Sequence, residues 1–224
     1  MENYIQGFKI ALSGVGTTLS ITSVGVILGV TIGLIVAIMR ISNNKILKGI
    51  AVVYVEILRG TPLLVQACIA YFGIPMILQS NGIDFRYESA LVCGMVVCGI
   101  NSSAYVSEIF RAGLNSIDVG QMEAARSLGM TYFQTMRFVI VPQAFRVVLP
   151  SLANEFITLI KETSVLSVIT ISEVTRKSML WTSATFLPWP GYLGTAAVYL
   201  MMTIPLSKGV NILERKLSKN DKSK

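Results

Sequence analysis

The chain has 224 residues, of which 53% are hydrophobic and 14% charged, and its formal net charge is +7. A mean hydropathy of +0.64 excludes an ordinary soluble domain and predicts an integral membrane protein. The positive residues lie at the ends of apolar runs and in the tail, where they act as topology signals, so no nucleic-acid partner is expected.

The first apolar run covers residues 10–39 and contains no charge. It is long for one crossing, which predicts a tilted span or one with an interfacial lead-in. Arg40, Lys45 and Lys48 follow with no acid among them, so this loop is predicted to be cytoplasmic and the amino terminus external. No cleaved signal is expected, because the first residues carry no basic cluster.

Two further spans are predicted at about 53–78 and 89–110. The turn between them balances Asp84, Arg86 and Glu88, as an external loop can. The second of these spans therefore returns the chain to the cytoplasm at Arg111.

A polar segment at 116–142, here called the elbow, follows the third span. Asp118 with Gln121 three residues later resembles a capping box in loose form, which predicts that a short helix begins there. Gly129 supplies the left-handed residue that ends such a helix.

A second short helix is predicted to begin at Thr131, which forms a strict capping box with Gln134. Pro142 lacks the amide hydrogen that a helix interior needs, so the helix should stop or kink there. The elbow is therefore two short helices that turn at Gly129, although the residues also allow an amphipathic loop on the membrane surface.

The last two spans are predicted at about 147–172 and 191–213, separated by a polar-aromatic stretch, Trp181 to Trp189, that suits an external interface. The fourth span is interrupted by Pro150, Glu155, Lys161 and Glu162. The tail is basic and predicted cytoplasmic, and its last few residues are expected to be disordered.

These segments predict an all-α membrane protein that forms one domain over residues 1–224. It has five transmembrane helices, an external amino terminus, a cytoplasmic carboxyl terminus and a cytoplasmic elbow between spans three and four. Cys68, Cys93 and Cys98 lie in apolar runs and histidine is absent, so the cysteines are interpreted as packing residues and no metal site is predicted.

The elbow resembles the signature loop of ABC-importer permease subunits, which pairs a Glu-Ala-Ala run with a later glycine and a terminal proline. Val139 and Val141 replace the usual isoleucine and leucine of that loop. In this family the loop couples the permease to an ATPase, which assigns that role to Glu123, Ala124, Ala125, Gly129 and Pro142.

Other segments are similar to the polar amino-acid branch of these permeases, which imports amino acids such as glutamine, glutamate, arginine, histidine, lysine or cystine. The matching residues of structural type are Arg59, Gly60, Thr61, Pro62, Glu108 and Arg111. The substrate-binding residues predicted with this resemblance are Gln66, Asn101, Tyr105, Glu155, Thr163 and Ser164.

Several of these residues have a structural alternative. Thr61 and Pro62 can kink the second span, with the threonine hydroxyl satisfying freed backbone groups. Asn101 can serve helix packing, and Glu108 can pair with Arg111 at i,i+3.

Glu155 is the sharpest candidate, because a carboxylate inside a span is a functional site by default and would suit an amino group. The spacing does not favour an ion pair of Glu155 with Lys161 or with Arg146.

The resemblance implies a transport subunit in the cytoplasmic (inner) membrane of a bacterium, not an enzyme, since no phosphate-binding loop or catalytic set is present. The chain itself needs no cofactor, because ATP and magnesium bind the partner. The predicted partners are an ABC ATPase, a second permease copy or paralogue, an external amino-acid-binding protein and membrane lipid. The alternatives are an ion-coupled secondary transporter and a non-transporting membrane anchor for a cytoplasmic protein.

Overall fold

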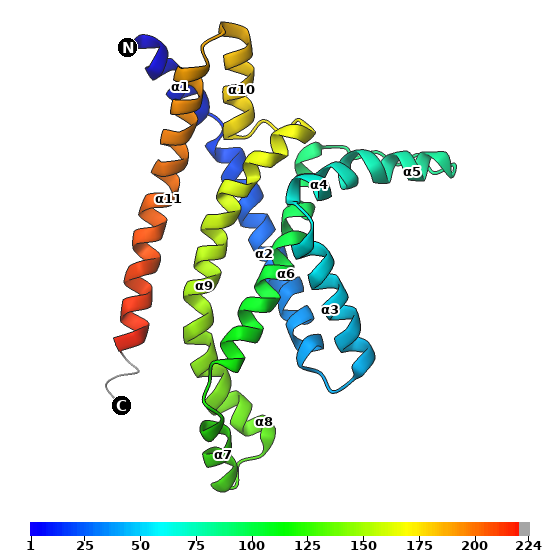
Figure 1. The fold of residues 1–224 in the computed structure, drawn as a ribbon, viewed down its shortest axis with the longest axis vertical. Helices are drawn as coiled ribbons and strands as arrows, with labels where there is room; N and C mark the ends of the chain where they lie inside the picture. The colour runs from blue at the N-terminus through cyan, green and yellow to red at the C-terminus, as the bar shows by residue number, and fades with distance from the viewer. Residues whose placement is uncertain (220–224) are drawn as a thin grey trace.

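The structure, a computed structural model, describes residues 1–219, and the basic end at 220–224 that was predicted to be disordered lies outside the described residues. Long helices form the body, short ones lie at its two ends, and other short ones project from its side (Figure 1). The α-helices are α1 Glu2–Leu12, α2 Val15–Ile41, α3 Lys45–Gly60, α4 Leu63–Cys68, α5 Ile74–Ser80, α6 Ala90–Asn115, α7 Val119–Ser127, α8 Tyr132–Thr135, α9 Val141–Glu162, α10 Val174–Thr185 and α11 Pro188–Lys219. Two π-helical turns, η1 Ile69–Gly73 and η2 Met136–Ile140, and the 3₁₀-helix η3 Thr163–Ile169 join them.

Five helical stretches of the described chain are long and apolar enough to cross a membrane, as the sequence predicts. They are Glu2–Ile41, Leu63–Ser80, Ala90–Asn115, Tyr132–Ile169 and Pro188–Leu217. Residues 1–219 contain no strand, so the all-α prediction is confirmed for this part of the chain.

The first apolar stretch is divided into two helices, because α1 ends at Leu12 and α2 begins at Val15. The chain passes close to α10 at this junction: a Cβ on Gly14 would lie 2.4 Å from the backbone nitrogen of Val174. The long uncharged run is therefore a full span, α2, preceded by a separate helix that packs on α10 and α11.

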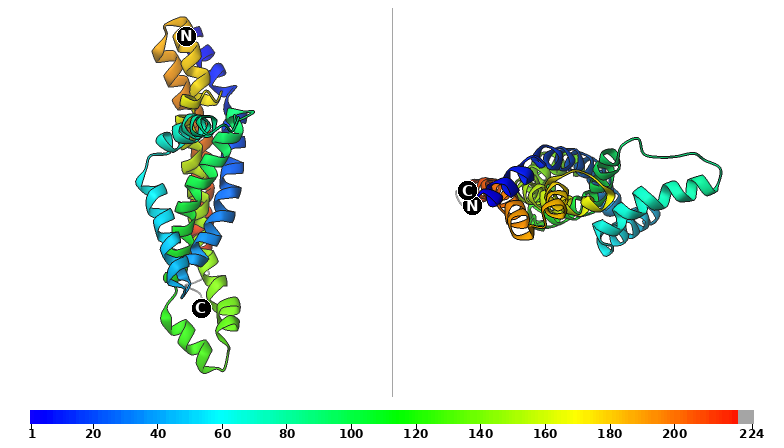
Figure 2. Two further views of the ribbon diagram at one scale, coloured as in Figure 1. Left: turned by 90° about the vertical axis from the view of Figure 1, so that its right-hand side faces the viewer. Right: turned by 90° about the horizontal axis from the view of Figure 1, so that it is seen from above.

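The second span is not the continuous helix that was predicted over 53–78. Thr61 adopts an extended conformation, with φ −121° and ψ 142°, as the residue before a proline commonly does. Pro62 then begins a new helical run, α4 to α5, which projects sideways from the bundle (Figure 2). The predicted kink is thus a complete break.

The centre of the bundle is the pair α2 and α6, which approach closely because α2 presents glycine to α6. A Cβ on Gly29 would lie 2.9 Å from the hydroxyl of Ser102, and one on Gly33 would lie 2.8 Å from the carbonyl of Ser103. Small residues at such contacts let helix backbones pack tightly without lipid between them. This packing holds Ser102 fully buried.

The three cysteines are free thiols, and Cys93 and Cys98 are buried in the same core as Ile21 and Leu159. Their position agrees with the packing role predicted for them. Among the described residues, no three His, Cys, Asp or Glu side chains gather as a metal site would require.

At one end of the molecule α1, α10 and the beginning of α11 lie together, and the elbow lies at the opposite end (Figure 1). Glu173 caps α10 and is fully buried. Its carboxylate accepts hydrogen bonds from the amides of Thr175 and Arg176, both at 2.7 Å, and from the hydroxyl of Tyr199 at 3.0 Å. Burial raises the pKa of Glu173, because desolvation disfavours the charged carboxylate.

Candidate functional site

The first helix of the elbow, α7, begins where the sequence predicts. The Asp118 carboxylate accepts a hydrogen bond of 2.7 Å from the amide of Gly120, which caps the helix. Gln121 does not complete the box; its side-chain oxygen accepts a 3.3 Å bond from Gln143 and so links α7 to α9. Gly129 follows α7 with φ +85°, the left-handed conformation predicted for it.

The second helix begins with the predicted capping box at Thr131. Its hydroxyl accepts from the amide of Gln134 at 3.3 Å, and its own amide donates to the Gln134 side chain at 2.8 Å. The helix does not stop at Pro142, because the π-helical turn η2 shifts the register and places this proline in the first turn of α9. A missing amide hydrogen costs little in a first turn, so the helical run continues from Tyr132 to Ile169.

The outer surface of the elbow carries Glu123 and Ala124, which are exposed, whereas Ala125 is only 5% exposed. Ala125 is therefore packed inside the elbow, which contacts η2 through α7, whereas Ala124 exposes its small side chain. Large apolar side chains also stand free here, with Leu128 85% and Phe133 70% exposed.

The break between α3 and α4 is closed by the side chain of Gln66. Its amide nitrogen donates to the carbonyl of Leu58 at 2.8 Å, and to the carbonyl and hydroxyl of Thr61 at 3.1 and 2.9 Å. The Thr61 hydroxyl itself donates to the carbonyl of Ile57 at 2.8 Å, as the structural alternative required. Gln66 thus supplies the hydrogen bond that the break removes from the helix.

Gln66 also connects this break to α6, because its oxygen accepts a 3.0 Å hydrogen bond from the Asn101 side chain. Beside this contact lies a largely apolar hollow of about 260 Å³. Its lining residues are Ile57, Leu58, Thr61, Val65, Gln66, Ile69, Ala70, Ile74, Val97 and Ile100. Two predicted site residues, Gln66 and Asn101, therefore contact each other, and Gln66 also lines the hollow.

Glu155 on α9 is partly buried and accepts a 2.8 Å hydrogen bond from Ser102, the residue after Asn101 on α6. The expectation that Lys161 and Arg146 do not pair with Glu155 stays a prediction.

Thr163 and Ser164 begin η3, which packs against α4, the helix that carries Gln66. The Thr163 hydroxyl is buried and donates to the carbonyl of Ile160 at 2.7 Å, so it is engaged in ending α9. Ser164 is half-buried in the same turn.

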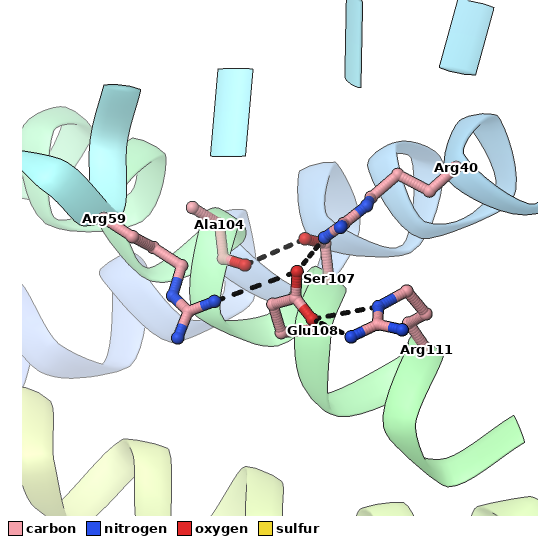
Figure 3. A network of polar contacts seen from close by, with 6 residues as sticks. All are labelled: Arg40, Arg59, Ala104, Ser107, Glu108 and Arg111. Atoms are coloured by element: carbon pink, nitrogen blue, oxygen red, sulfur yellow. Dashed lines mark hydrogen bonds and ion pairs between the residues drawn. The ribbon is translucent and has the colours of Figure 1, made fainter. Parts of the chain in front are cut away.

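Glu108 on α6 joins three arginines from three helices (Figure 3). Arg111 donates from two nitrogens at 3.0 and 2.8 Å, which confirms the predicted i,i+3 pair. Arg40 of α2 bonds the other carboxylate oxygen, and Arg59 of α3 lies 3.8 Å from that oxygen. The guanidinium carbon of Arg59 also lies over the ring of Tyr105, 5.3 Å from its centre, as in a cation–π contact.

Sequence reasoning did not include Arg40 or Ser102 among the site residues. Arg40 was interpreted only as a topology signal, and no spacing in the sequence indicates that it meets a residue 68 positions away. The available signal was indirect: Glu108 is an acid within an apolar span and requires compensation by cations.

Comparison with known proteins identifies the chain's relatives. Residues 29–219 match the family described as binding-protein-dependent transport system inner membrane component. The chain is 37% identical to the nopaline transport system permease protein NocM of Agrobacterium fabrum, covering 94% of this chain and 88% of that protein. It is also 37% identical to the arginine transport system permease protein ArtQ of Bacillus subtilis, covering 94% and 93%.

Among solved structures, an amino acid ABC transporter with histidines is similar to this chain, with a TM-score of 0.86 and 42% identity. The match covers 95% of this chain and 96% of that chain.

Proposed function

This chain belongs to the binding-protein-dependent transport system inner membrane component family, and we propose that it translocates a polar amino acid in an ATP-driven importer. A member of this family is a transport subunit, and a separate chain hydrolyses the ATP. The amino-acid cargo is supported by the relatives described as an arginine permease and an amino acid ABC transporter.

The elbow is the single observation that carries this proposal. It is held by three caps, at Asp118, Gly129 and Thr131, and stands at one end of the bundle (Figure 1). Glu123 is exposed on its first helix. A rigid projection of this kind can transmit a movement of a docked ATPase to the spans that follow it. ATP binding then favours one of two bundle states by differential contact energy.

The proposed orientation places the elbow and the carboxyl terminus in the cytoplasm and the amino terminus outside. The basic loop between α2 and α3, with Lys45 and Lys48, supports it through the positive-inside rule. ATP and magnesium would bind the ATPase, and an external binding protein would deliver the cargo at the end where α1 and α10 lie.

The proposed cargo path follows the polar groups between α4, α6 and α9. Its residues are Gln66, Asn101, Tyr105, Glu155, Thr163 and Ser164. Glu155 attracts the amino group, because it is a carboxylate inside a predicted span, where the Ser102 hydroxyl donates to it. The hollow beside Gln66 opens on one side of the chain, so a second permease copy or a paralogue completes the enclosure.

The proposal is tested by ATP hydrolysis in the reconstituted complex of permease, co-purified ATPase and binding protein, titrated with polar amino acids. One or a few amino acids should stimulate hydrolysis, and Glu123→Arg should abolish the stimulation. Glu214→Arg, at an exposed glutamate of α11, is the matched control and should retain it. If no amino acid stimulates ATP hydrolysis, the membrane-anchor or ion-coupled alternatives would be favoured instead.

A further inference from the structure

Of the three arginines around Glu108, Arg59 makes the weakest contact with the carboxylate. Arg111 takes one carboxylate oxygen with two hydrogen bonds, and Arg40 bonds the other. Arg59 lies 3.8 Å from the second oxygen, which is an ion-pair distance but too long for a hydrogen bond. Its side chain is 45% exposed, so its donors remain available.

The cluster carries more positive than negative charge. Three guanidinium groups form ion pairs with the single Glu108 carboxylate. The ion pairs of this cluster therefore hold more positive than negative charge. A surplus charge inside a membrane bundle indicates contact with water, with protein or with an oppositely charged ligand.

Arg59 lies beside the break between α3 and α4, two residues before Thr61, which lines the hollow together with Gln66.

The surroundings of the guanidinium suit a carboxylate. Its central carbon lies 5.3 Å from the ring centre of Tyr105, within cation–π range, and the Arg59 side chain is 45% exposed, so its N–H donors can reach a carboxylate. Tyr105 is one helical turn after Asn101, on the same face of α6. The donors therefore stand beside the polar groups of the proposed path.

We propose that Arg59 binds the α-carboxylate of the imported amino acid, with Glu108 and Tyr105 holding the guanidinium in position. This assignment rests on the proposed function and adds a specificity-determining residue to it. Two residues of α6 then position the side chains that bind the two charges of a zwitterion. Tyr105 contacts Arg59, which binds the carboxylate, and Ser102 contacts Glu155, which binds the amino group.

The test measures binding to the permease–ATPase complex in phosphatidylcholine vesicles without the binding protein, which would impose its own selectivity. The probes are L-arginine and L-glutamine, each compared with its α-carboxamide. The wild type should prefer the acid to the amide by about 10- to 100-fold, as the loss of a charge-assisted hydrogen bond predicts. Arg59→Gln should reduce this preference to about threefold or less, because the amino acid with a free carboxylate binds more weakly. Arg59→Lys should restore part of the preference.

Arg111→Gln is the matched control, because it removes the same charge from the same carboxylate and should keep the acid-to-amide preference. A preference retained in Arg59→Gln would overturn the assignment and leave the importer intact. If the wild type binds neither probe, the same comparison is made with L-glutamate, L-histidine, L-lysine and L-cystine, and binding of none of these would overturn the polar amino-acid cargo and the assignment with it. An Arg59→Gln effect that needs added phosphatidylglycerol and is equal for acid and amide would assign the residue to lipid instead.

Discussion

Gln66 donates its side-chain amide to the carbonyl of Leu58, eight residues earlier, across the point where Pro62 interrupts the second span. The same side chain accepts from Asn101. Gln66, a residue of the proposed path, therefore also stabilises the helix break and links it to α6. Its structural role and its transport role must be measured separately.

Gln66→Leu should destabilise the protein, because it leaves the Leu58 carbonyl and the Asn101 amide without their partner. Each buried group left unpaired costs about 1–3 kcal/mol, and thermal unfolding of the purified protein in detergent should show a lower Tm. Gln79→Leu, at an exposed glutamine of α5, is the control. Equal Tm values for the two variants would contradict the role of Gln66 at the break.

Glu155→Gln should impair transport more than Ser102→Ala. The glutamine retains an acceptor for Ser102 but removes the charge that attracts an amino group, and a charged hydrogen bond contributes about 1.5–3 kcal/mol, or roughly 10- to 100-fold in affinity. Uptake into proteoliposomes should show the loss as a higher KM. Wild-type uptake by Glu155→Gln would remove this residue from the path.

Gly129→Ala should uncouple ATP hydrolysis from uptake. Nothing lies within 4 Å of an added Cβ, so the effect comes from φ +85°, where an alanine costs roughly 1–2 kcal/mol. The ratio of ATP hydrolysed to amino acid transported should rise. Gly49→Ala adds a methyl group to an equally open site in α3 and should behave as wild type, whereas Gly129→Asn should recover part of the coupling.

Glu108→Gln should lower the free energy of unfolding by about 3 kcal/mol, because three guanidinium groups lose the carboxylate they share. A double-mutant cycle with Arg111→Gln checks this mechanism. Removing Arg111 should cost less in the Glu108→Gln background than in the wild type, since it then relieves repulsion. Additive effects would show that the two side chains do not interact.

The stability of the α10 end should depend on pH through Glu173. Burial raises the pKa of this carboxyl, so the folded state holds the proton more tightly than the unfolded chain. The stabilising contribution is complete below the unfolded pKa of about 4.3 and is lost as pH rises through the folded pKa.

As pH rises from about 4, near the unfolded pKa, Tm should fall more steeply in the wild type than in Glu173→Gln. Glu88→Gln, at an exposed acid, should keep the wild-type slope. A slope that Glu173→Gln leaves unchanged would assign the pH dependence to other groups.

The sequence by itself determined the membrane class, the number of candidate spans and the caps of the elbow. These features depend on local chemistry: apolar runs of sufficient length, a glycine that accepts a positive φ, and a threonine with a glutamine three residues later. For the same reason the pair of Glu108 and Arg111 could be predicted, because i,i+3 residues are neighbours on any helix.

The tertiary structure decided which residues of different helices meet. Pro142 continues a helix because a π-helical turn precedes it, and the break at Pro62 is complete because Gln66 satisfies the carbonyl on its other side. The meetings of Arg40 with Glu108 and of Ser102 with Glu155 join residues 68 and 53 positions apart. They depend on how closely α2, α6 and α9 pack, which no local pattern of residues contains.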